Sequence, residues 1–515
     1  MLYCVGPLSS LWLKPISSDA RFSTILRKMG LAFDKPLGSS LSSASSTIRE
    51  KSIVVLPFEN MSPDKDNEYF SDGLTEEIIA DLSNVNELSV ISRGSAMTFK
   101  GTKKKTKAIA EEVNVRYVLE GSVRKEGNNL RVTAQLIDGT TDVHVWSEKY
   151  AGTLDHVFEI QEKLSRSIVA ALKVQLSTGE NEKLTKRPIA NLRAYECYLQ
   201  AKKEYATNSK EGLDRALFLT REALQLEGDN ELLFGTMASI YYGMWFSGFV
   251  DADKNYERET KTCMESAFKL NPQSPQGYFA AGVLDYMQGK RQDAVLNFKL
   301  ILKTDPSNSA TMLILGTIYL DVGRAEAADP LLQRLLALDP LTAINQVMVG
   351  YLEWQQGRFQ VALPYWKRAY ELEPGVPPNV WSYACALASS GKKDEALQVI
   401  GQMVSAKIPG PFTTMAQLLQ CGLTGNKEAA IKLLTPEFVG FAKSLPFVSR
   451  DLAGYLGMVG LLDEALDYVE KTIDMGYINY PFLALHHPFY ETLRSHPRFA
   501  KLMERIKPQW EAFEV

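Results

Sequence analysis

The hydrophobic positions in the central part of the chain recur with a fixed period. Across residues 275–396, apolar stretches with helical spacing come in pairs, and small residues punctuate them every 34 positions. The markers are Gly289, Gly323, Gly357 and Gly391, then Ala294, Ala328, Ala362 and Ala396, then Pro306, Pro340 and Pro374. Three coincident series over four units predict a solenoid of helical hairpins, in which each unit packs on the next.

Each marker has a physical role in such a hairpin. One position of the first helix always carries a small residue, so we expect the two helices to cross closely there. The residues at this position are Gly282, Gly316, Gly350 and Ala384. Gly289 and its equivalents should end the first helix in the left-handed conformation, and the Asp-Pro or Glu-Pro pairs should end the second. Phe298, Leu332 and Trp366 share one large apolar position, predicted to pack between hairpins. A 34-residue unit of this kind is typical of tetratricopeptide repeats.

The repeats extend beyond their regular core. We expect an all-α solenoid of about seven hairpins over residues 190–475, less regular over 190–274 and with a longer loop at 246–253. Residues 476–515 should form a C-terminal capping helix region, because a solenoid must cover its last apolar surface.

Residues 51–178 have a different pattern, with short apolar runs and period-two alternation. The pattern predicts an α/β domain with a mixed sheet in the order βαβαβββα. Strands are expected at 52–58, 88–92, 116–124, 130–137 and 144–150, and helices at 71–82, 105–112 and 153–176.

Three blocks of this domain resemble a known family. SIVVLPFENMSPDKDNEYFSDGLTEEI, VRYVLEGSVRKEGNNLRVTAQLID and HVWSEKY resemble the TolB-like amino-terminal domain of bacterial signalling proteins. In that family the domain precedes tetratricopeptide repeats and often follows a nucleotide cyclase, a winged-helix DNA-binding domain or a protein kinase. The resemblance implies a sensory or docking role in signal transduction, without catalysis.

Residues 1–50 are predicted to be a flexible N-terminal segment, with a Ser-rich linker at 37–47. Residues 18–29 share an S-x-x-R-F pattern with residues 495–506, near the end of the repeats. One hypothesis is descent from a longer or tandem protein whose upstream part is missing. The alternative is that both segments are generic short helices.

Charge and cysteine content narrow the classes of function. The net charge of -4 argues against a nucleic-acid-binding protein. The five cysteines have no metal-binding spacing, which favours a reducing compartment. Without an 18-residue apolar run or a signal-peptide pattern, we expect a cytoplasmic protein with no membrane span, or a periplasmic one if an upstream anchor was lost.

No catalytic motif stands out in the sequence. Phosphate-binding loop, dinucleotide-binding, nucleophile-elbow, zinc-protease and kinase patterns are all missing, so we expect no catalytic residue, metal or cofactor. His486 and His487 are adjacent and would not share a face of a helix or strand, so we do not expect them to bind a metal ion together. Glu76 and Glu77 are explained by favourable charge at a helix N-terminus. The basic run at 100–107 is interpreted as a solvated loop and helix start.

What remains is a surface for protein or peptide partners. The repeat register predicts a concave groove that is apolar and aromatic, and such surfaces are candidate peptide-binding sites. Its residues are Phe279, Val283, Tyr286, Leu313, Thr317, Leu320, Val347, Tyr351, Trp354 and Trp381, with Cys385 beside them. The alternative is that some of these aromatics pack inside the superhelix.

The sequence therefore favours a non-enzymatic signalling or scaffold protein. The other interpretation is the regulatory part of an adenylate cyclase or DNA-binding transcription regulator whose effector domain lies elsewhere. The oligomeric state stays open.

Overall fold

The structure of the protein is a computed structural model that describes residues 49–185, 187–207, 209–247, 249 and 255–515. The Ser-rich linker predicted at 37–47 and the pattern at 18–29 lie outside the described residues. So does most of the loop predicted to lengthen the second hairpin.

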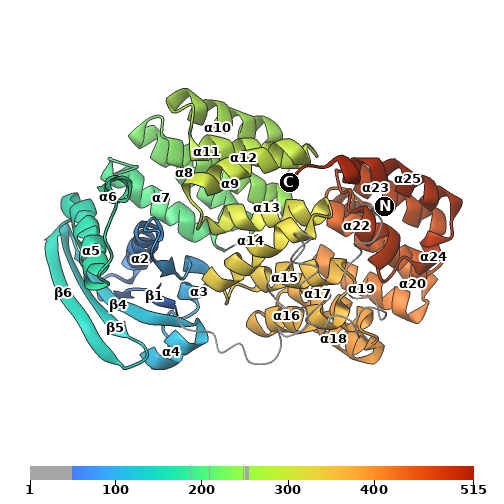
Figure 1. The fold of residues 1–515 in the computed structure, drawn as a ribbon, viewed down its shortest axis with the longest axis horizontal. Helices are drawn as coiled ribbons and strands as arrows, with labels where there is room; N and C mark the ends of the chain where they lie inside the picture. Colours follow the sequence, from blue (N-terminus) through green and yellow to red (C-terminus); the bar gives the residue numbers. More distant parts are fainter. Residues whose placement is uncertain (1–48, 186, 208, 248, 250–254) are drawn as a thin grey trace, which may run out of the picture. The chain divides into compact units, whose positions relative to one another are not determined.

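The N-terminal part is a mixed sheet covered by helices, as the alternating pattern predicts (Figure 1). The strand order is β3-β1-β4-β5-β6, and the short β2 pairs with β4. β1 is parallel to β3 and β4, whereas β5 is antiparallel to both of its neighbours, β4 and β6. The strands are β1 Arg49–Val55, β2 Glu59–Asn60, β3 Ser89–Val90, β4 Val115–Glu126, β5 Asn129–Asp138 and β6 Val143–Thr153.

One face of the β4–β5 hairpin forms the core of this domain. Leu130, Val132, Ala134 and Leu136 alternate along β5 and are almost fully buried, while the residues between them are more exposed. The hairpin turns at Gly127, whose φ of 56° is left-handed. Helices α2 (Glu68–Ser83) and α5 (Val157–Ala171) contribute buried apolar side chains to the same core.

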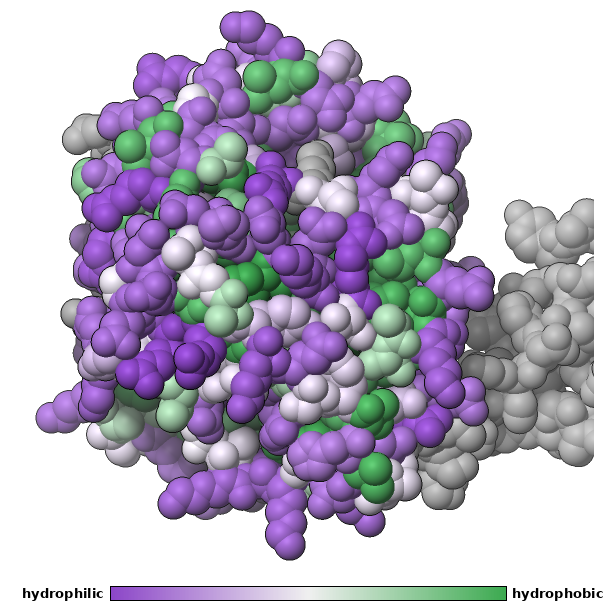
Figure 2. All heavy atoms as spheres, turned by 90° about the vertical axis from the view of Figure 1, so that its left-hand side faces the viewer, coloured by the Kyte–Doolittle hydropathy of each residue, from purple (hydrophilic) through white to green (hydrophobic). Residues whose placement is uncertain are grey.

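The strand β6 forms one edge of the sheet. Val143 and Val145 expose 57% and 43% of their surface, and charged Glu148 and Lys149 follow them. Charged side chains on an edge strand discourage unwanted pairing with other strands. On the side of the molecule that carries this strand, hydrophilic side chains predominate and apolar ones lie in small separate groups (Figure 2).

Several elements of this domain differ from the sequence prediction. The strand expected over 52–58 ends at Val55, and β3 has only two residues. The helix expected over 153–176 is α5 alone, because Lys173 just after it has a left-handed φ of 55°. The short helices α3 (Arg93–Met97) and α6 (Thr178–Thr185) were not predicted. Helix α4 (Thr106–Glu112) lies where the sequence predicts it.

Helical hairpins follow, as the 34-residue period predicts. Eight pairs of helices succeed one another among the described residues, with the short α21 (Pro436–Ala442) before the last pair. The pairs are α7 Leu192–Tyr205 and α8 Lys210–Glu227; α9 Glu231–Phe246 and α10 Tyr256–Leu270; α11 Pro275–Met287 and α12 Arg291–Thr304; α13 Ser309–Asp321 and α14 Ala325–Leu338; α15 Ala343–Gln355 and α16 Phe359–Leu372; α17 Pro377–Ser389 and α18 Lys393–Ser405; α19 Pro411–Thr424 and α20 Lys427–Leu433; α22 Pro446–Met458 and α23 Leu462–Asp474.

The turn glycines have the predicted conformation. Gly289, Gly323, Gly357 and Gly391 have φ values of 78°, 69°, 74° and 79°, which residues with a side chain adopt only with strain. The Asp-Pro and Glu-Pro pairs follow directly after the ends of α12, α14 and α16, where proline stops the helix.

The large apolar position of each repeat packs against the small residue of its own hairpin. A Cβ atom on Gly282 would lie 2.8 Å from the ring of Phe298, and one on Gly316 would lie 2.7 Å from Leu332. The large side chain on the second helix therefore fills the space that the glycine leaves on the first helix of the same hairpin. This contact within one hairpin was not predicted, and the packing predicted between hairpins stays a prediction.

The chain closes with short helices. A five-residue π-helix spans Phe482–His486, α24 spans Glu491–Arg494, and α25 spans Pro497–Ala512. Phe499, Leu502 and Ile506 of α25 are buried in the same core as α22 and α23. The terminal helix thus covers the last apolar surface of the repeats.

The sheet domain makes direct hydrogen bonds to the middle of the solenoid. The amide of Ser92 donates to the carbonyl of Leu338 over 2.8 Å. The amide and hydroxyl of Ser95 donate to the Asp339 carboxylate over 2.8 and 2.6 Å, and both residues are buried. The start of α3 is therefore held against the turn between α14 and α15.

No helix in the described part of the chain is both long and apolar enough to cross a lipid bilayer.

Candidate functional site

The residues of the predicted groove are mostly inside the solenoid. Six of them expose at most 5% of their surface: Val283, Tyr286, Leu320, Val347, Trp354 and Trp381. Phe279, Leu313, Thr317 and Tyr351 are half-buried. Cys385 is buried as well. For the six buried residues this is the arrangement expected if aromatics pack inside the superhelix.

The side chains that cover Trp354 and Trp381 come from the C-terminal quarter of the chain. The ring of Trp354 lies 4.8 Å from that of Phe482 and 5.4 Å from that of His487, measured between centroids. Trp381 donates its indole N–H to the hydroxyl of Tyr455 over 2.9 Å.

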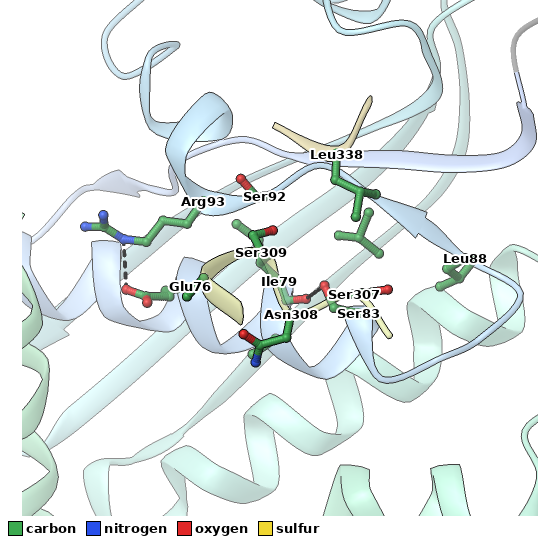
Figure 3. Close-up of a pocket in the computed structure, with 13 residues that line it drawn as sticks. Glu76, Ile79, Ser83, Leu88, Ser92, Arg93, Ser307, Asn308, Ser309 and Leu338 are labelled. Carbon is green, nitrogen blue, oxygen red and sulfur yellow. Dashed lines mark hydrogen bonds and ion pairs between the residues drawn. The ribbon is translucent and has the colours of Figure 1, made fainter. Parts of the chain in front are cut away.

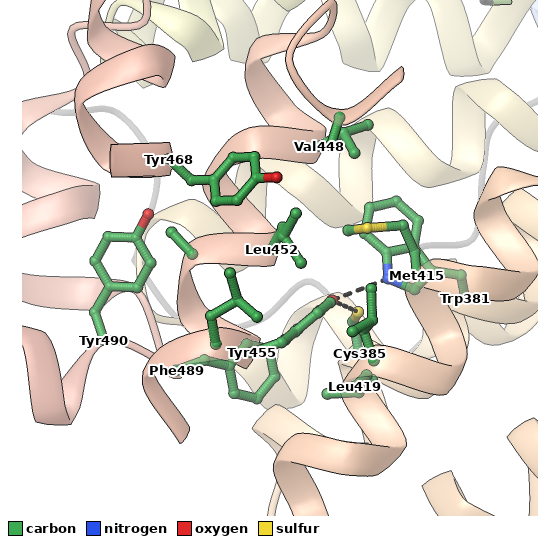
Figure 4. Close-up of a cluster of buried hydrophobic side chains, with 14 of the residues drawn as sticks. Trp381, Cys385, Met415, Leu419, Val448, Leu452, Tyr455, Tyr468, Phe489 and Tyr490 are labelled. Carbon is green, nitrogen blue, oxygen red and sulfur yellow. Dashed lines mark hydrogen bonds between the residues drawn. The ribbon is translucent and has the colours of Figure 1, made fainter. Parts of the chain in front are cut away.

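The same Tyr455 hydroxyl binds the repeat helix at a second point. It lies 3.0 Å from the sulfur of Cys385, and the three residues form a small polar network inside an apolar cluster (Figure 4). Tyr455 belongs to α22, so the contact joins the last helical pair to α17. Burial raises the pKa of the Cys385 thiol far above its ordinary range, which leaves the thiol protonated and unreactive.

A buried arginine occupies the centre of this region. Arg450 exposes 1% of its surface, and its guanidinium lies over the rings of Tyr477, Tyr351, Phe482 and Trp354 at 5.2 to 5.7 Å. Cation–π contacts of this kind are strongest when water is excluded. The aromatic residues predicted to bind a partner therefore surround a cation of the same chain.

The charge of Arg450 is balanced by its neighbour in sequence. Asp451 accepts two hydrogen bonds from the guanidinium, over 2.7 and 2.9 Å. Burial alone would raise the pKa of Asp451, but Arg450 and His487 together hold it below its ordinary value. The pair is ionised inside the protein, where an unbalanced charge would be costly.

His487 completes the cluster. Its Nε2 lies 3.3 Å from an Asp451 oxygen, and its ring stacks on Tyr490 with centroids 3.8 Å apart. Burial lowers the pKa of His487 to about 4, although Asp451 acts in the opposite direction. The imidazole is therefore neutral at pH 7 and serves as a packed, hydrogen-bonded core residue.

A second buried ion pair lies nearby in the repeats. Asp321 accepts a hydrogen bond from the Tyr286 hydroxyl over 3.1 Å and lies 3.8 Å from Arg291. The Arg291 side chain also donates to the carbonyl of Met475 over 2.8 Å. This pair thus connects α11, α12 and α13 to the segment after α23.

That segment runs along three successive repeat turns. A Cβ on Gly289 would lie 3.6 Å from the Met475 carbonyl, one on Gly323 would lie 2.8 Å from the Asn479 side chain, and one on Gly357 would lie 3.1 Å from His486. Residues 475–487 therefore follow the row of turn glycines, one repeat after another. We call residues 475–490 the closing segment.

The charged cluster was missed in the sequence. Arg450 and Asp451 stand side by side in a helix whose other residues are mostly apolar, and this was the available signal. In the sequence, His487 stands out only as one of two adjacent histidines that would not share a face. In the described residues no group of three metal-ligating side chains occurs, and His487 binds Asp451 instead.

The explanation predicted for Glu76 and Glu77 is wrong. Helix α2 begins at Glu68, so these two residues lie well inside the helix rather than at its N-terminus. Glu76 instead forms ion pairs with Arg93 over 2.8 Å and with Lys202 over 2.6 Å. Lys202 is on α7, so Glu76 connects the sheet domain to the first repeat.

The basic run at 100–107 is partly paired. Lys100 contacts Asp72 and Glu68, at 2.7 and 2.8 Å, and Lys104 contacts Glu112 at 2.5 Å. Helix α4 begins at Thr106. The predicted loop followed by a helix start is present. Lys100 and Lys104 form ion pairs there, which the prediction did not include.

The chain has relatives of two kinds. Residues 49–169 match the family model described as HilA/YgeH-like transcriptional regulator, second domain. Residues 313–377 match the tetratricopeptide repeat model. Repeats of this class are thus present, joined to a regulator-type domain. The TolB-like assignment of the first domain stays a prediction.

One curated relative is a bacterial protein of Rhizobium meliloti (strain 1021) named "Putative adenylate cyclase 3". It is 46% identical to this chain over 151 residues. The match covers 29% of this chain and 26% of the relative, so it spans about a quarter of each protein.

Solved structures with helical repeats are also similar. The Cut9-Hcn1 complex of the APC/C matches with a TM-score of 0.37 and 15% identity, over 68% of this chain and 74% of that one. A thermophilic tetratricopeptide repeat protein of Thermus thermophilus matches with a TM-score of 0.31 and 21% identity, over 38% of this chain and 99% of that one. With TM-scores this low, the fold rests on the helical pairs described above.

Proposed function

We propose that this chain is a non-catalytic protein-interaction unit of a bacterial signalling system. The observation that carries the proposal is the joining of a regulator-type α/β domain to a run of tetratricopeptide repeats, a class of repeat that commonly presents a surface to protein partners. In this proposal the sheet domain, of the TolB-like kind, senses or docks, and the solenoid holds a protein or peptide partner.

The partner surface is proposed to include the half-buried members of the predicted groove. Phe279, Leu313, Thr317 and Tyr351 retain exposed surface, whereas Trp354 and Trp381 do not. A partner would reach Trp354 only if the closing segment moved away, and Trp381 only if Tyr455 of α22 did. Direct contact with the outer members requires no such movement.

A second candidate function is favoured by the relatives. One relative is named as an adenylate cyclase and matches over 151 residues, and the family model is that of a transcriptional regulator. Both support the idea that this chain is a regulatory part that acts on an effector domain. In that case the partner would be a nucleotide cyclase or a DNA-binding module, and this chain would modulate it.

Capture of partners from cells of the source organism tests the proposal. The full chain is compared with the double variant Phe279→Ser and Leu313→Ser, followed by mass spectrometry of the bound proteins. We expect the double variant to lose at least one partner by about tenfold, because apolar anchors dominate such interfaces. Enrichment of a cyclase or a DNA-binding protein would favour the second candidate.

The matched control changes two exposed apolar residues on α12, the second helix of its hairpin. Leu296 and Leu300 of α12 expose 55% and 42% of their surface, and both are changed to serine. Capture should be unaffected in this control. Equal capture by both folded double variants would refute binding through the predicted groove.

A further inference from the structure

A cleft lies between the sheet domain and the solenoid. Two hollows, of about 310 and 470 Å³, share the lining residues Leu88, Ser307 and Leu338 and so adjoin each other. One wall comes from α2, β3 and the start of α3, and the other from the loop before α13 and the end of α14 (Figure 3). Clefts of this size at domain interfaces commonly bind small molecules.

The outer hollow has an excess of positive charge. Its lining includes three cations, Arg49, Lys51 and Arg334, and one carboxylate, Glu87, which is paired with Lys51. This is notable in a protein whose net charge is -4.

Two of these cations lack a carboxylate partner in the described part of the chain. Arg49 donates to the Ser89 hydroxyl over 3.3 Å, and Arg334 donates to the Ser307 hydroxyl over 3.4 Å. Both bonds are long and go to neutral groups, so both guanidinium groups retain hydrogen-bonding capacity. Arg49 comes from the sheet domain and Arg334 from α14, so an anion between them would contact both walls.

The inner hollow differs in character. Its walls carry apolar side chains, among them Ile79, Leu88, Val90 and Leu338, together with serine hydroxyls. Ser92 lines this hollow, and its buried hydroxyl has no hydrogen-bond partner within the described residues. At the end of this hollow away from Leu88, Glu76 and Arg93 form an ion pair (Figure 3).

We propose that this cleft binds a small organic phosphate of mononucleotide size. The phosphate lies between Arg49 and Arg334, since guanidinium groups match phosphate oxygens in charge and geometry. The nucleoside part extends into the inner hollow, over the apolar walls and toward the Ser92 hydroxyl. Because such a ligand touches both domains, its binding stabilises their contact. The proposal goes beyond partner binding and does not depend on it.

Isothermal titration calorimetry on the full chain tests this site. The probes are the four common ribonucleoside monophosphates, cyclic AMP, adenosine and inorganic phosphate. We expect saturable binding of at least one nucleotide, with adenosine and inorganic phosphate each about tenfold weaker or more. Absence of saturable binding by every nucleotide in this set would overturn the proposal, and so would equal affinity for inorganic phosphate.

Variants separate the two ends of the cleft. Arg49→Gln and Arg334→Gln should each weaken nucleotide binding about tenfold, because each removes one charged phosphate contact. Ala310→Trp, which fills part of the inner hollow, should abolish the preference for nucleotides over inorganic phosphate. Arg124→Gln is the matched control, since Arg124 is exposed on β4 and pairs only with Glu126 among the described residues.

Thermal unfolding of each variant confirms that it is folded. Unchanged nucleotide affinity in both Arg49→Gln and Arg334→Gln would place binding elsewhere and refute the site. Tighter binding of a phosphoserine peptide than of any nucleotide would refute the small-molecule class.

Discussion

Three glycines in the solenoid face large side chains across their own hairpins. The pairs are Gly282 with Phe298, Gly316 with Leu332 and Gly350 with Trp366. The approach is tightest at the tryptophan, where a Cβ on Gly350 would lie only 2.1 Å from the indole of Trp366. These glycines are required by packing, since they lie inside helices where alanine would ordinarily be preferred.

Gly350→Ala should therefore destabilise the protein. The added methyl forces Trp366 out of its position, and its indole N–H then loses the 2.8 Å bond to the Val347 carbonyl. We expect a loss of about 1–3 kcal/mol in the free energy of unfolding, measured by chemical denaturation.

Gly401→Ala provides the matched comparison. Gly401 is also inside a helix, α18, but a Cβ there would meet nothing within 4 Å. This variant should gain about 0.5–1 kcal/mol from helix propensity alone. A loss in Gly401→Ala, or a gain in Gly350→Ala, would contradict the packing explanation.

The repeat residues could be predicted because their constraints are local. Each constraint selects one residue type at a fixed position in the repeat. A left-handed turn selects glycine, the end of the second helix selects proline, and a close helix crossing selects a small residue. Arg450 and His487 could not be assigned in this way, because the rings around Arg450 and the carboxylate beside His487 lie on other elements. Only the unusual pair of charges in an apolar helix marked that site.

At the scale of elements, α2 and α5 meet through a half-buried carboxylate. Asp81 on α2 accepts hydrogen bonds from Ser165 over 2.8 Å and Gln161 over 3.2 Å, both on α5. Burial is the main cause that raises the pKa of Asp81 to about 7, and the charges of Glu77 and Glu162 add to it. The helices thus pack best when Asp81 is protonated.

This shift sets the direction of a pH effect. The pKa of Asp81 is higher in the folded state than in the unfolded chain, so the folded protein binds more protons between about pH 4 and 7. The contribution of Asp81 to stability is largest below about pH 4 and falls as the pH rises to about 7. His487 acts in the opposite direction, since its pKa is lowered and its contribution grows as the pH rises.

Asp81→Asn isolates the carboxylate contribution. The amide oxygen can still accept from Ser165 and Gln161, and the variant carries no charge. We expect it to be more stable than the original by about 1–2 kcal/mol at pH 8 and by much less at pH 5. Denaturant unfolding at the two pH values measures the difference. Asp229→Asn, at an exposed position between α8 and α9, should show no such dependence.

At the scale of the whole molecule, the closing segment joins distant repeats. Asn479, which is 4% exposed, donates to the Leu320 carbonyl over 2.9 Å and to the Gln355 side chain over 3.0 Å. Farther along the chain, the Arg324 side chain binds the carbonyl oxygens of Trp510 and Phe513. The end of the chain is thus part of the packing of the middle repeats.

Asn479→Ala should consequently affect more than its own surroundings. It leaves the Leu320 carbonyl and the Gln355 side chain without this buried donor, and we expect a loss of about 2–3 kcal/mol. Hydrogen exchange should become faster in residues 318–325 and 353–359 as well as in the closing segment. Faster exchange confined to residues 475–490 would show that the contact is only local. Asn128→Ala, at an exposed turn of the sheet domain, should change neither quantity appreciably.

The sequence could predict the solenoid but not its closure. Each hairpin is specified by residues within about one repeat. The contact between Arg450 and Tyr351, in contrast, depends on how the small rotations between successive hairpins add up along the solenoid. The same summation buries Trp354 and Trp381, which the register alone assigns to an open surface. The cleft beside Arg49 and Arg334 depends in turn on how the sheet domain meets α14.

The row of turn glycines under the closing segment has an evolutionary consequence. Open repeat arrays gain and lose units readily, since each unit touches only its neighbours. Here Gly289, Gly323 and Gly357 must meet Met475, Asn479 and His486 in register. Inserting or deleting one 34-residue unit between Gly357 and Met475 would move every one of these contacts at once. Homologous proteins that keep this closure should therefore keep the same number of repeats in that interval, and length variation should fall elsewhere in the chain.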